Sequence, residues 1–356
     1  MALVLAALLV APRTQAVIFY STGDANHNTG LPTGDLAGSG AQYQGIWRGF
    51  GGTPVAPNLF VTAQHVGGSV GEEFQFDGAR YRTAAAYADP ESDLIVWRVC
   101  GVFPRYAPLY SGSDETGQSC VLWGRGLSRG GEMILTNGTQ TILKGWYWGT
   151  ADGRLRWGEN VVKAIVDTSR LTESLLKFEF NAGAGPNEAM LANGDSGSGL
   201  FLKEGGVWVL AGVNYAVDGP FNTVASGTGF FAALFDMGGL YARTTEGEWA
   251  QVQDRPADRP ASCYATRIAR RRAWLEAILA RHAASDVVPV LQSAPRPEGA
   301  YTDEPATDID VVNGVIRWAR PSGNRFYRLR ECVLLKISGF SIEGGDLVLR
   351  YAPWPE

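Results

Sequence analysis

The sequence contains few histidines and few cysteines. Among its 356 residues there are 3 histidines and 4 cysteines. No two cysteines have the spacing of metal ligands, and with so few histidines we do not expect a zinc site. No cluster of ligands in the sequence points to another metal ion, calcium included. The four cysteines fit an oxidising compartment with disulfide bonds, but they permit three pairings, among which the sequence does not choose. They are Cys100, Cys120, Cys263 and Cys332.

The chain also lacks an excess of basic charge and any long apolar run. Lysine and arginine total 31 against 36 acidic residues, which gives a net charge of −5. A nucleic-acid-binding protein normally presents a basic surface, so we do not expect a nucleic-acid partner. No apolar run approaches the ~18 residues of a membrane-spanning helix. Aromatic residues make up 11% of the chain, which argues against disorder.

Glycine, proline and tryptophan are abundant, at 45, 18 and 11 residues. This composition favours many short strands joined by tight turns. No amphipathic helix separates the apolar segments between 42 and 217, so a parallel α/β sheet is not expected and the sequence predicts an all-β fold. The clearest predicted strands are 59–61, 94–97, 120–123, 161–166 and 207–210.

The remainder of the chain predicts one helix and a separate tail. Apolar residues fall on one side of a helix over 265–283, and arginines fall on the rest. We interpret that arginine cluster as a solvated face, with an anionic partner as the alternative. Residues 284–300 contain several prolines and predict a linker, and 301–356 predict a small β module.

The N-terminus resembles an export signal. Met1 to Val10 are apolar, and Ala16 follows the small residue Thr14 by two positions, as at a signal-peptidase site. We therefore predict a signal peptide over 1–16, a mature chain from Val17, and a secreted, periplasmic or cell-surface location. No lysine or arginine precedes the apolar run, and a buried first strand is the alternative.

Three residues have the chemistry of a nucleophilic active site. Ser196 lies in a glycine-flanked turn, which lets backbone N–H groups point at one substrate atom. A serine needs a base within hydrogen-bond reach and a carboxylate to orient that base. His65 follows a predicted strand and Asp93 begins another. Each feature alone is weak, but their order in a β-rich chain favours a catalytic triad.

Here the sequence resembles the chymotrypsin/trypsin-like serine proteases, over roughly 41–283. The segments 60–65 and 193–199 are similar to the family's histidine and nucleophile motifs, with Gln64 and Ser198 as departures. The segments 211–216 and 263–275 are similar to its substrate-pairing strand and its final strand and helix. The resemblance implies a two-barrel protease domain over 17–283 with a C-terminal helix, and a serine endopeptidase that acts on polypeptides as a monomer without a cofactor.

By that resemblance Ser196 is the nucleophile, His65 is the general base and then acid, and Asp93 orients the imidazole. The backbone N–H groups of Gly194 and Ser196 form the oxyanion hole.

The family's substrate-binding positions correspond to Met190, Asn214, Tyr215 and Ala216. Met190, at the base of the specificity pocket, is not acidic, which disfavours cleavage after lysine or arginine. Ala216 stands at a position where the family often has glycine, so its side chain should narrow the mouth of the pocket. We therefore expect a small or medium apolar residue before the scissile bond.

Activation in this family uses a freed apolar N-terminus that pairs with the carboxylate before the nucleophile, here Asp195. Signal cleavage alone would free Val17, so export itself could supply that ammonium group. The alternative is that local side chains or amides hold Asp195.

Two other functions compete with the protease. An α/β-hydrolase esterase needs a histidine after the serine, and the only later one, His282, lies in the arginine-rich helix. A catalytically inert, protease-like binding or adhesion module is the second alternative. For the tail we expect surface attachment, sorting or substrate binding.

Overall fold

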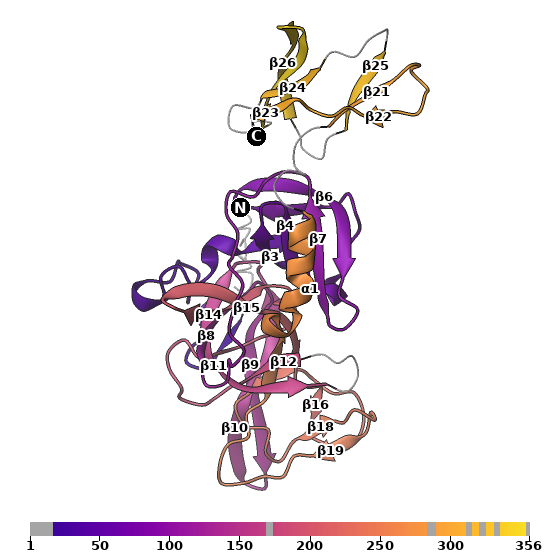
Figure 1. Ribbon diagram of the computed structural model, residues 1–356. Coiled ribbons are helices and arrows are strands. Elements are labelled where there is room, and N and C mark those ends of the chain that lie inside the picture. The colour runs from indigo at the N-terminus through magenta and orange to yellow at the C-terminus, as the bar shows by residue number, and fades with distance from the viewer. Residues whose placement is uncertain are drawn as a thin grey trace, which may run out of the picture.

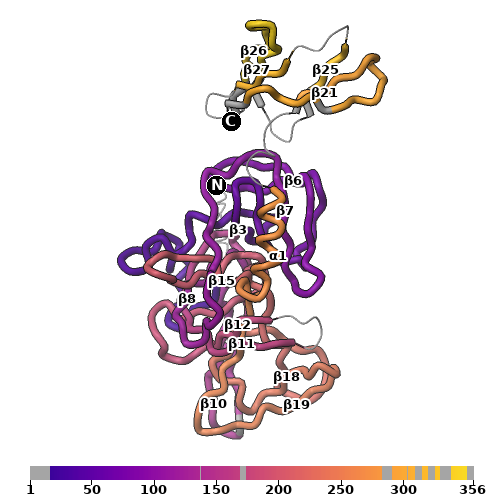
Figure 2. Tube along the Cα trace, viewed as in Figure 1, coloured from indigo at the N-terminus to yellow at the C-terminus, as the bar shows by residue number. Residues whose placement is uncertain are grey.

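The computed structural model describes residues 17–168, 174–282, 290–310, 315–319, 325–330 and 335–353, and most of its regular structure is β-strand (Figure 1). The predicted signal peptide, 1–16, lies outside these residues. The prediction of a mostly β protein is confirmed, and the first 282 residues include two closed antiparallel barrels of six strands each. Figure 2 traces the chain through the first barrel, in indigo and purple, before it enters the second.

The first barrel is built on aromatic side chains. In β5 (Glu73–Phe76), exposed and buried residues alternate, so Phe74 and Phe76 face the interior. Phe60 stacks on Phe74 with 3.8 Å between ring centroids, and Trp47 is fully buried beside them. Around this barrel the strands are β2 (Gly45–Trp47), β3 (Phe50–Ala56), β4 (Leu59–Ala63), β7 (Leu94–Val99), β6 (Ala79–Ala88) and β5 (Glu73–Phe76).

The second barrel has a more aliphatic core. Leu122, Leu176, Leu200 and Leu202 are fully buried in one cluster. Around this barrel the strands are β11 (Arg156–Asp167), β12 (Ser174–Glu179), β20 (Ser262–Arg267), β15 (Val207–Val217), β14 (Gly199–Glu204) and β8 (Ser119–Gly124).

Short elements surround the two barrels. A long hairpin of β9 (Leu127–Asn137) and β10 (Gln140–Ala151) adds β17 (Ala232–Leu234) at its edge. The segment 218–262, which we call the inserted segment because it interrupts the motifs of the family that the sequence resembles, also forms β16 (Phe221–Asn222), β18 (Tyr241–Arg243) and β19 (Trp249–Gln251). Near the N-terminus β1 (Ile18–Phe19) pairs with β13 (Ala189–Met190). Single 3-10 turns are η1 (Gly34–Leu36), η2 (Ala41–Tyr43) and η3 (Gln64–Val66).

The predicted helix is confirmed as α1 (Ile268–Arg281), which begins later than expected because β20 extends to Arg267. Its apolar face packs into the cluster that contains the first barrel's core, and the helix is drawn in orange in Figure 1. The interpretation of its arginines as a solvated face is wrong for Arg271. This residue is 8% exposed and makes ion pairs with Asp89 and Glu91.

The tail forms a small β module with its own core. The strands of each of its two sheets pair only with one another in the described part of the chain, and Leu291, Trp318 and Leu349 belong to a separate apolar cluster. The linker prediction is wrong for residues 290–294, which form a strand because their hydrogen-bond partners lie in 326–330. One sheet contains β22 (Thr302–Asp303), β21 (Val290–Ala294) and β25 (Phe326–Arg330). The other contains β23 (Asp308–Asp310), β24 (Val315–Ala319), β27 (Asp346–Pro353) and β26 (Leu335–Glu343).

Two of the four cysteines form no disulfide bond. Cys120 and Cys263 are free thiols in the core of the second barrel. Burial raises the pKa of the Cys263 thiol to about 12 and raises that of Cys120 as well. Only a bond between Cys100 and Cys332 would be left, and Cys332 lies outside the described residues. Within the described ranges, no helix has both the length and the apolarity to cross a membrane.

Candidate active site

The pairing of β4 with β7 brings His65 to Asp93. Ala63 lies opposite Leu94 in this antiparallel pair, so the residues just after β4 meet those just before β7. The turn η3 then directs the His65 side chain. One carboxylate oxygen of Asp93 accepts the backbone N–H of His65 at 2.9 Å, and the other lies 2.6 Å from His65 Nδ1. These bonds fix both the position and the ring orientation of the imidazole.

The turn 193–197 of the second barrel completes the group from the opposite side, and we call it the nucleophile turn after the role predicted for Ser196. Ser196 Oγ lies 2.9 Å from His65 Nε2, a distance at which the hydroxyl donates to the ring nitrogen. The backbone N–H of Gly51, in the first barrel, donates to the carbonyl of Ser196 at 3.0 Å. A side chain at position 51 would collide with Ser198, since a Cβ there would lie 2.1 Å from its Oγ. Glycine at 51 therefore allows the two barrels to approach closely at this point.

The predicted oxyanion donors lie in the same turn. Gly194 has a φ of +97°, which favours glycine, and a Cβ there would lie 2.6 Å from the Cα of Gly126. In the described part of the chain, the backbone N–H groups of Gly194 and Ser196 donate to no other protein group. Both donors therefore remain available for a substrate oxygen.

Asp195 is 1% exposed and holds this turn in place. Its carboxylate accepts the N–H of Gly126 at 2.7 Å and that of Ala192 at 2.8 Å, and the backbone amides of Val17 and Arg125 also bond to it. Burial outweighs these bonds and raises the pKa of Asp195 to about 7. The first described residue of the chain, Val17, is fully buried at this carboxylate.

A cavity of about 440 Å³ opens beside Ser196. Of the four predicted substrate-binding residues, Asn214, Tyr215 and Ala216 line it. Met190 does not: it is fully buried in the core, and its backbone pairs with Ile18 of β1. The prediction that Met190 forms the base of the pocket rested only on its position in the motif.

Sequence reasoning missed the aromatic side of this cavity. Trp148 of β10 and Phe231 both line it, and their rings stack with centroids 4.7 Å apart. They meet because Phe231 immediately precedes β17, which pairs with β10. The only sequence signal was the aromatic residues of the inserted segment, which gave no indication of their partner.

The lining carries little charge. His65 is bonded to Asp93 and Ser196, and the Asp195 carboxylate is bound by backbone amides. Leu191, Ala192 and Val217 add further apolar surface. Among the residues whose placement is described, no three histidine, cysteine or acidic side chains gather where they could hold a metal ion.

Searches against protein-family models and against curated proteins find no match to this chain.

Proposed function

We propose that this protein is a serine hydrolase with a chymotrypsin-like arrangement of two barrels. More specifically, we propose that it is an exported endopeptidase that cleaves polypeptides through an acyl-enzyme. The observation that carries the proposal is the continuous chain of contacts from Asp93 Oδ2 through His65 to Ser196 Oγ, at 2.6 and 2.9 Å.

The mechanism follows from these contacts. Ser196 Oγ attacks the scissile carbonyl carbon while its proton moves to His65 Nε2, and Asp93 stabilises the resulting imidazolium. The N–H groups of Gly194 and Ser196 donate to the oxyanion. When the tetrahedral intermediate collapses, His65 gives the proton to the leaving amine. Water, activated by the same imidazole, then hydrolyses the acyl-enzyme and regenerates the serine.

The lining of the cavity beside Ser196 favours a substrate with an apolar residue on the acyl side of the scissile bond. Its surface contains Leu191, Ala216 and the stacked pair Trp148 and Phe231, with no free cation or carboxylate to receive a charged side chain. Burying an apolar side chain there removes its surface from water without an unpaired charge.

The position of Val17 supports activation by removal of the predicted signal peptide. Its φ is +53°, which is costly for a β-branched residue. That angle exists only while the peptide bond to Ala16 is intact, so cleavage removes the restriction. The freed ammonium would then lie beside the buried Asp195 and would form an ion pair in place of a neutral amide contact.

Fluorophosphonate labelling tests the proposed function. With purified 17–356, we expect a single adduct on Ser196, identified by peptide mass spectrometry. His65→Ala should abolish labelling, and Asp93→Asn should slow it by about three to four orders of magnitude because the imidazole loses its orienting carboxylate. Asp35→Asn, at an exposed position, is the matched control and should label normally.

Absence of an adduct on folded protein that begins at Val17 would contradict the proposal. The protein would then be the non-catalytic, protease-like binding module.

A further inference from the structure

A second cavity, of about 390 Å³, lies between the barrels and shares no lining residue with the first. Its lining includes Gln44 and Ile46 from the start of the first barrel, the β5–β6 turn from Gln75 to Arg80, and Arg125, which follows β8. The side chains are mostly polar, in contrast to the apolar cavity beside Ala216.

Both sides of this second cavity contact the nucleophile turn. Ile46 pairs with Gly51, whose N–H donates to the Ser196 carbonyl. On the other side, Gly126 packs on Gly194, and the N–H of Leu127 donates to Asn193. The first cavity instead adjoins this turn through residues 214–217. A peptide whose acyl-side residue occupied the first cavity would therefore continue past Ser196 toward Arg125 on its leaving-group side.

Arg125 has a guanidinium group without a carboxylate partner among the described residues. Its Nη1 donates to the carbonyl of Gly153 at 3.0 Å, and its buried Nε has no hydrogen-bond partner. Burial lowers the pKa of this arginine, so its cation is poorly solvated.

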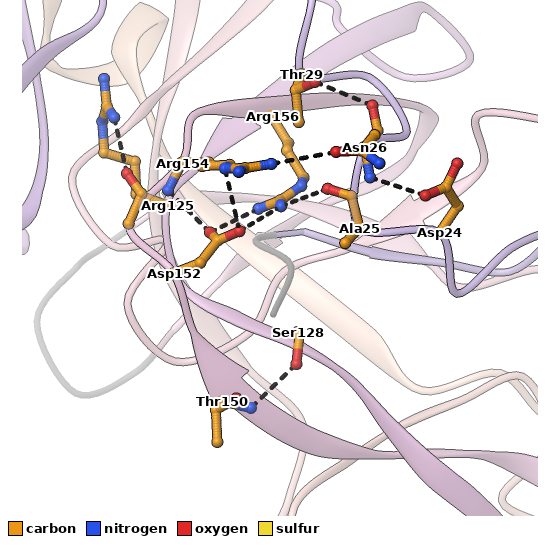
Figure 3. A network of polar contacts seen from close by, with 11 residues as sticks. Asp24, Ala25, Asn26, Thr29, Arg125, Ser128, Thr150, Asp152, Arg154 and Arg156 are labelled. Atoms are coloured by element: carbon orange, nitrogen blue, oxygen red, sulfur yellow. Dashed lines mark hydrogen bonds and ion pairs between the residues drawn. The ribbon is translucent and has the colours of Figure 1, made fainter. Parts of the chain in front are cut away.

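Asp152, the acid that precedes Gly153 in the chain, is already occupied by two other arginines. Figure 3 shows Arg154 and Arg156 converging on Asp152, with Arg125 to one side. Arg156 is fully buried and binds both carboxylate oxygens of Asp152, at 2.9 and 2.6 Å.

The other charges of the second cavity are also paired. Arg80 bonds to Glu73 at 3.1 Å, and Asp77 forms an ion pair with Arg105. The unbalanced charge in the lining is therefore the positive charge of Arg125.

We propose that the second cavity is a subsite for an acidic side chain of the substrate, aspartate or glutamate, on the leaving-group side of the scissile bond, with Arg125 as its cation. The assignment of this side rests on the proposed peptidase function, whereas the affinity of the cavity for a carboxylate does not. A bound carboxylate would supply the charge-assisted hydrogen bonds that the guanidinium lacks.

Peptide binding to full-length Ser196→Ala protein tests the subsite without requiring catalysis. The probes are short, C-terminally amidated peptides with aspartate or asparagine at the second or third residue, so that the side chain is the only carboxylate. By calorimetry at low salt, we expect the aspartate peptide to bind about five- to tenfold more tightly than its amide counterpart.

Variants assign this preference to Arg125. Arg125→Gln should remove it, Arg125→Lys should retain part of it, and Arg154→Gln, a neighbouring arginine outside the cavity, should leave it intact. Equal affinity of the two peptides for the Ser196→Ala protein overturns the subsite, whether or not the glutamine variant folds.

A cleavage assay distinguishes failure of the subsite from failure of the proposed peptidase function. If the wild-type protein labels on Ser196, the same substitution in an internally quenched substrate should change kcat/KM by the same five- to tenfold, at a residue after the scissile bond. A preference located before the scissile bond would contradict the assigned side. Selective binding without labelling or cleavage would retain the carboxylate site and reject the peptidase.

Discussion

At the scale of single residues, the carboxylates inside the two barrels differ in the groups that bind them. Asp93 bonds to an imidazole and Asp89 to a guanidinium, whereas Asp195 and Glu188 bond mainly to amides. Amides stabilise a carboxylate less than a cation does, so burial dominates. It raises the pKa of Asp195 and that of Glu188 to about 7.

Glu188 predicts a pH dependence of stability. Between pH 4.5 and 7 the folded protein retains a proton on this carboxyl that the unfolded chain has lost, so this residue's contribution to the free energy of unfolding falls as pH rises. We expect Glu188→Gln to be more stable than wild type at pH 8, by at most about 3 kcal/mol, and the gain to shrink toward pH 4.5. Urea unfolding at several pH values measures this.

Glu132→Gln is the matched control because Glu132 is exposed. A gain for Glu188→Gln that is the same at every pH would show that packing, and not titration, causes it.

At the scale of elements, short segments at the ends of strands form the candidate site. The turn before β7 carries Asp93 and is closed by its own contacts: Ser92 Oγ donates to Asp89 at 2.6 Å, and the N–H of Asp89 donates to Leu94. Helix α1 then holds this turn through Arg271, whose guanidinium binds both oxygens of Asp89. A helix remote in sequence thereby holds the turn that carries Asp93, the orienting carboxylate of the proposed triad.

Removal of Arg271 should affect both stability and reactivity. Arg271→Met leaves the buried carboxylate of Asp89 without its cation, so we expect a loss of about 3 to 5 kcal/mol in the free energy of unfolding. Labelling of Ser196 should slow, and its pH profile should change, because Asp93 no longer orients His65 in the same way. Arg271→Lys should recover part of both effects.

Arg270→Met is the control, since Arg270 is an exposed neighbour on α1. A destabilised Arg271 variant that labels with an unchanged rate and pH profile would limit the role of Arg271 to stability.

The position of Val17, just before β1 and next to Asp195, leads to a second prediction at this scale. Protein that begins with a free Val17 ammonium should label on Ser196 about tenfold faster or more than protein with a blocked or extended N-terminus, because a charged partner stabilises the Asp195 carboxylate more than an amide does. The ammonium should also lower the pKa of Asp195 from about 7. Labelling time courses of the two forms measure the difference, and equal rates would favour local amides as sufficient partners.

At the scale of the whole molecule, the barrels and the tail have separate apolar cores. The two clusters of the barrels contain only residues up to Ile278, whereas the third contains only residues from Leu291 onward. Burial of apolar surface drives the folding of each part, so the barrels do not depend on the tail for their core.

We therefore expect a chain of residues 17–283 to fold and to label on Ser196 at the rate of 17–356, within about twofold. Full-length protein should unfold in more than one transition, because each core melts separately. Thermal unfolding and labelling of the two proteins check this. A truncated protein that folds but does not label would show that the tail contributes to the site.

The sequence by itself determined the features that depend on local pattern. Strand-forming runs and turn residues predicted the β-rich fold, and the helix followed from its apolar periodicity. The motifs around His65, Asp93 and Ser196 identified three residues that the structure brings together. The prediction of a linker was wrong at 290–294, because strand formation there depends on a partner strand more than 30 residues away.

Tertiary structure alone decided the surroundings of these residues. The stack of Trp148 on Phe231, the core position of Met190, and the ion pair between Arg271 and Asp89, 182 positions apart, join segments that are distant in the chain. The unpaired charge of Arg125 likewise depends on Asp152 being occupied by Arg156. Local sequence encodes backbone preference and polarity, but which side chains meet depends on how the two barrels close and pack, and that is set by contacts summed over the whole fold.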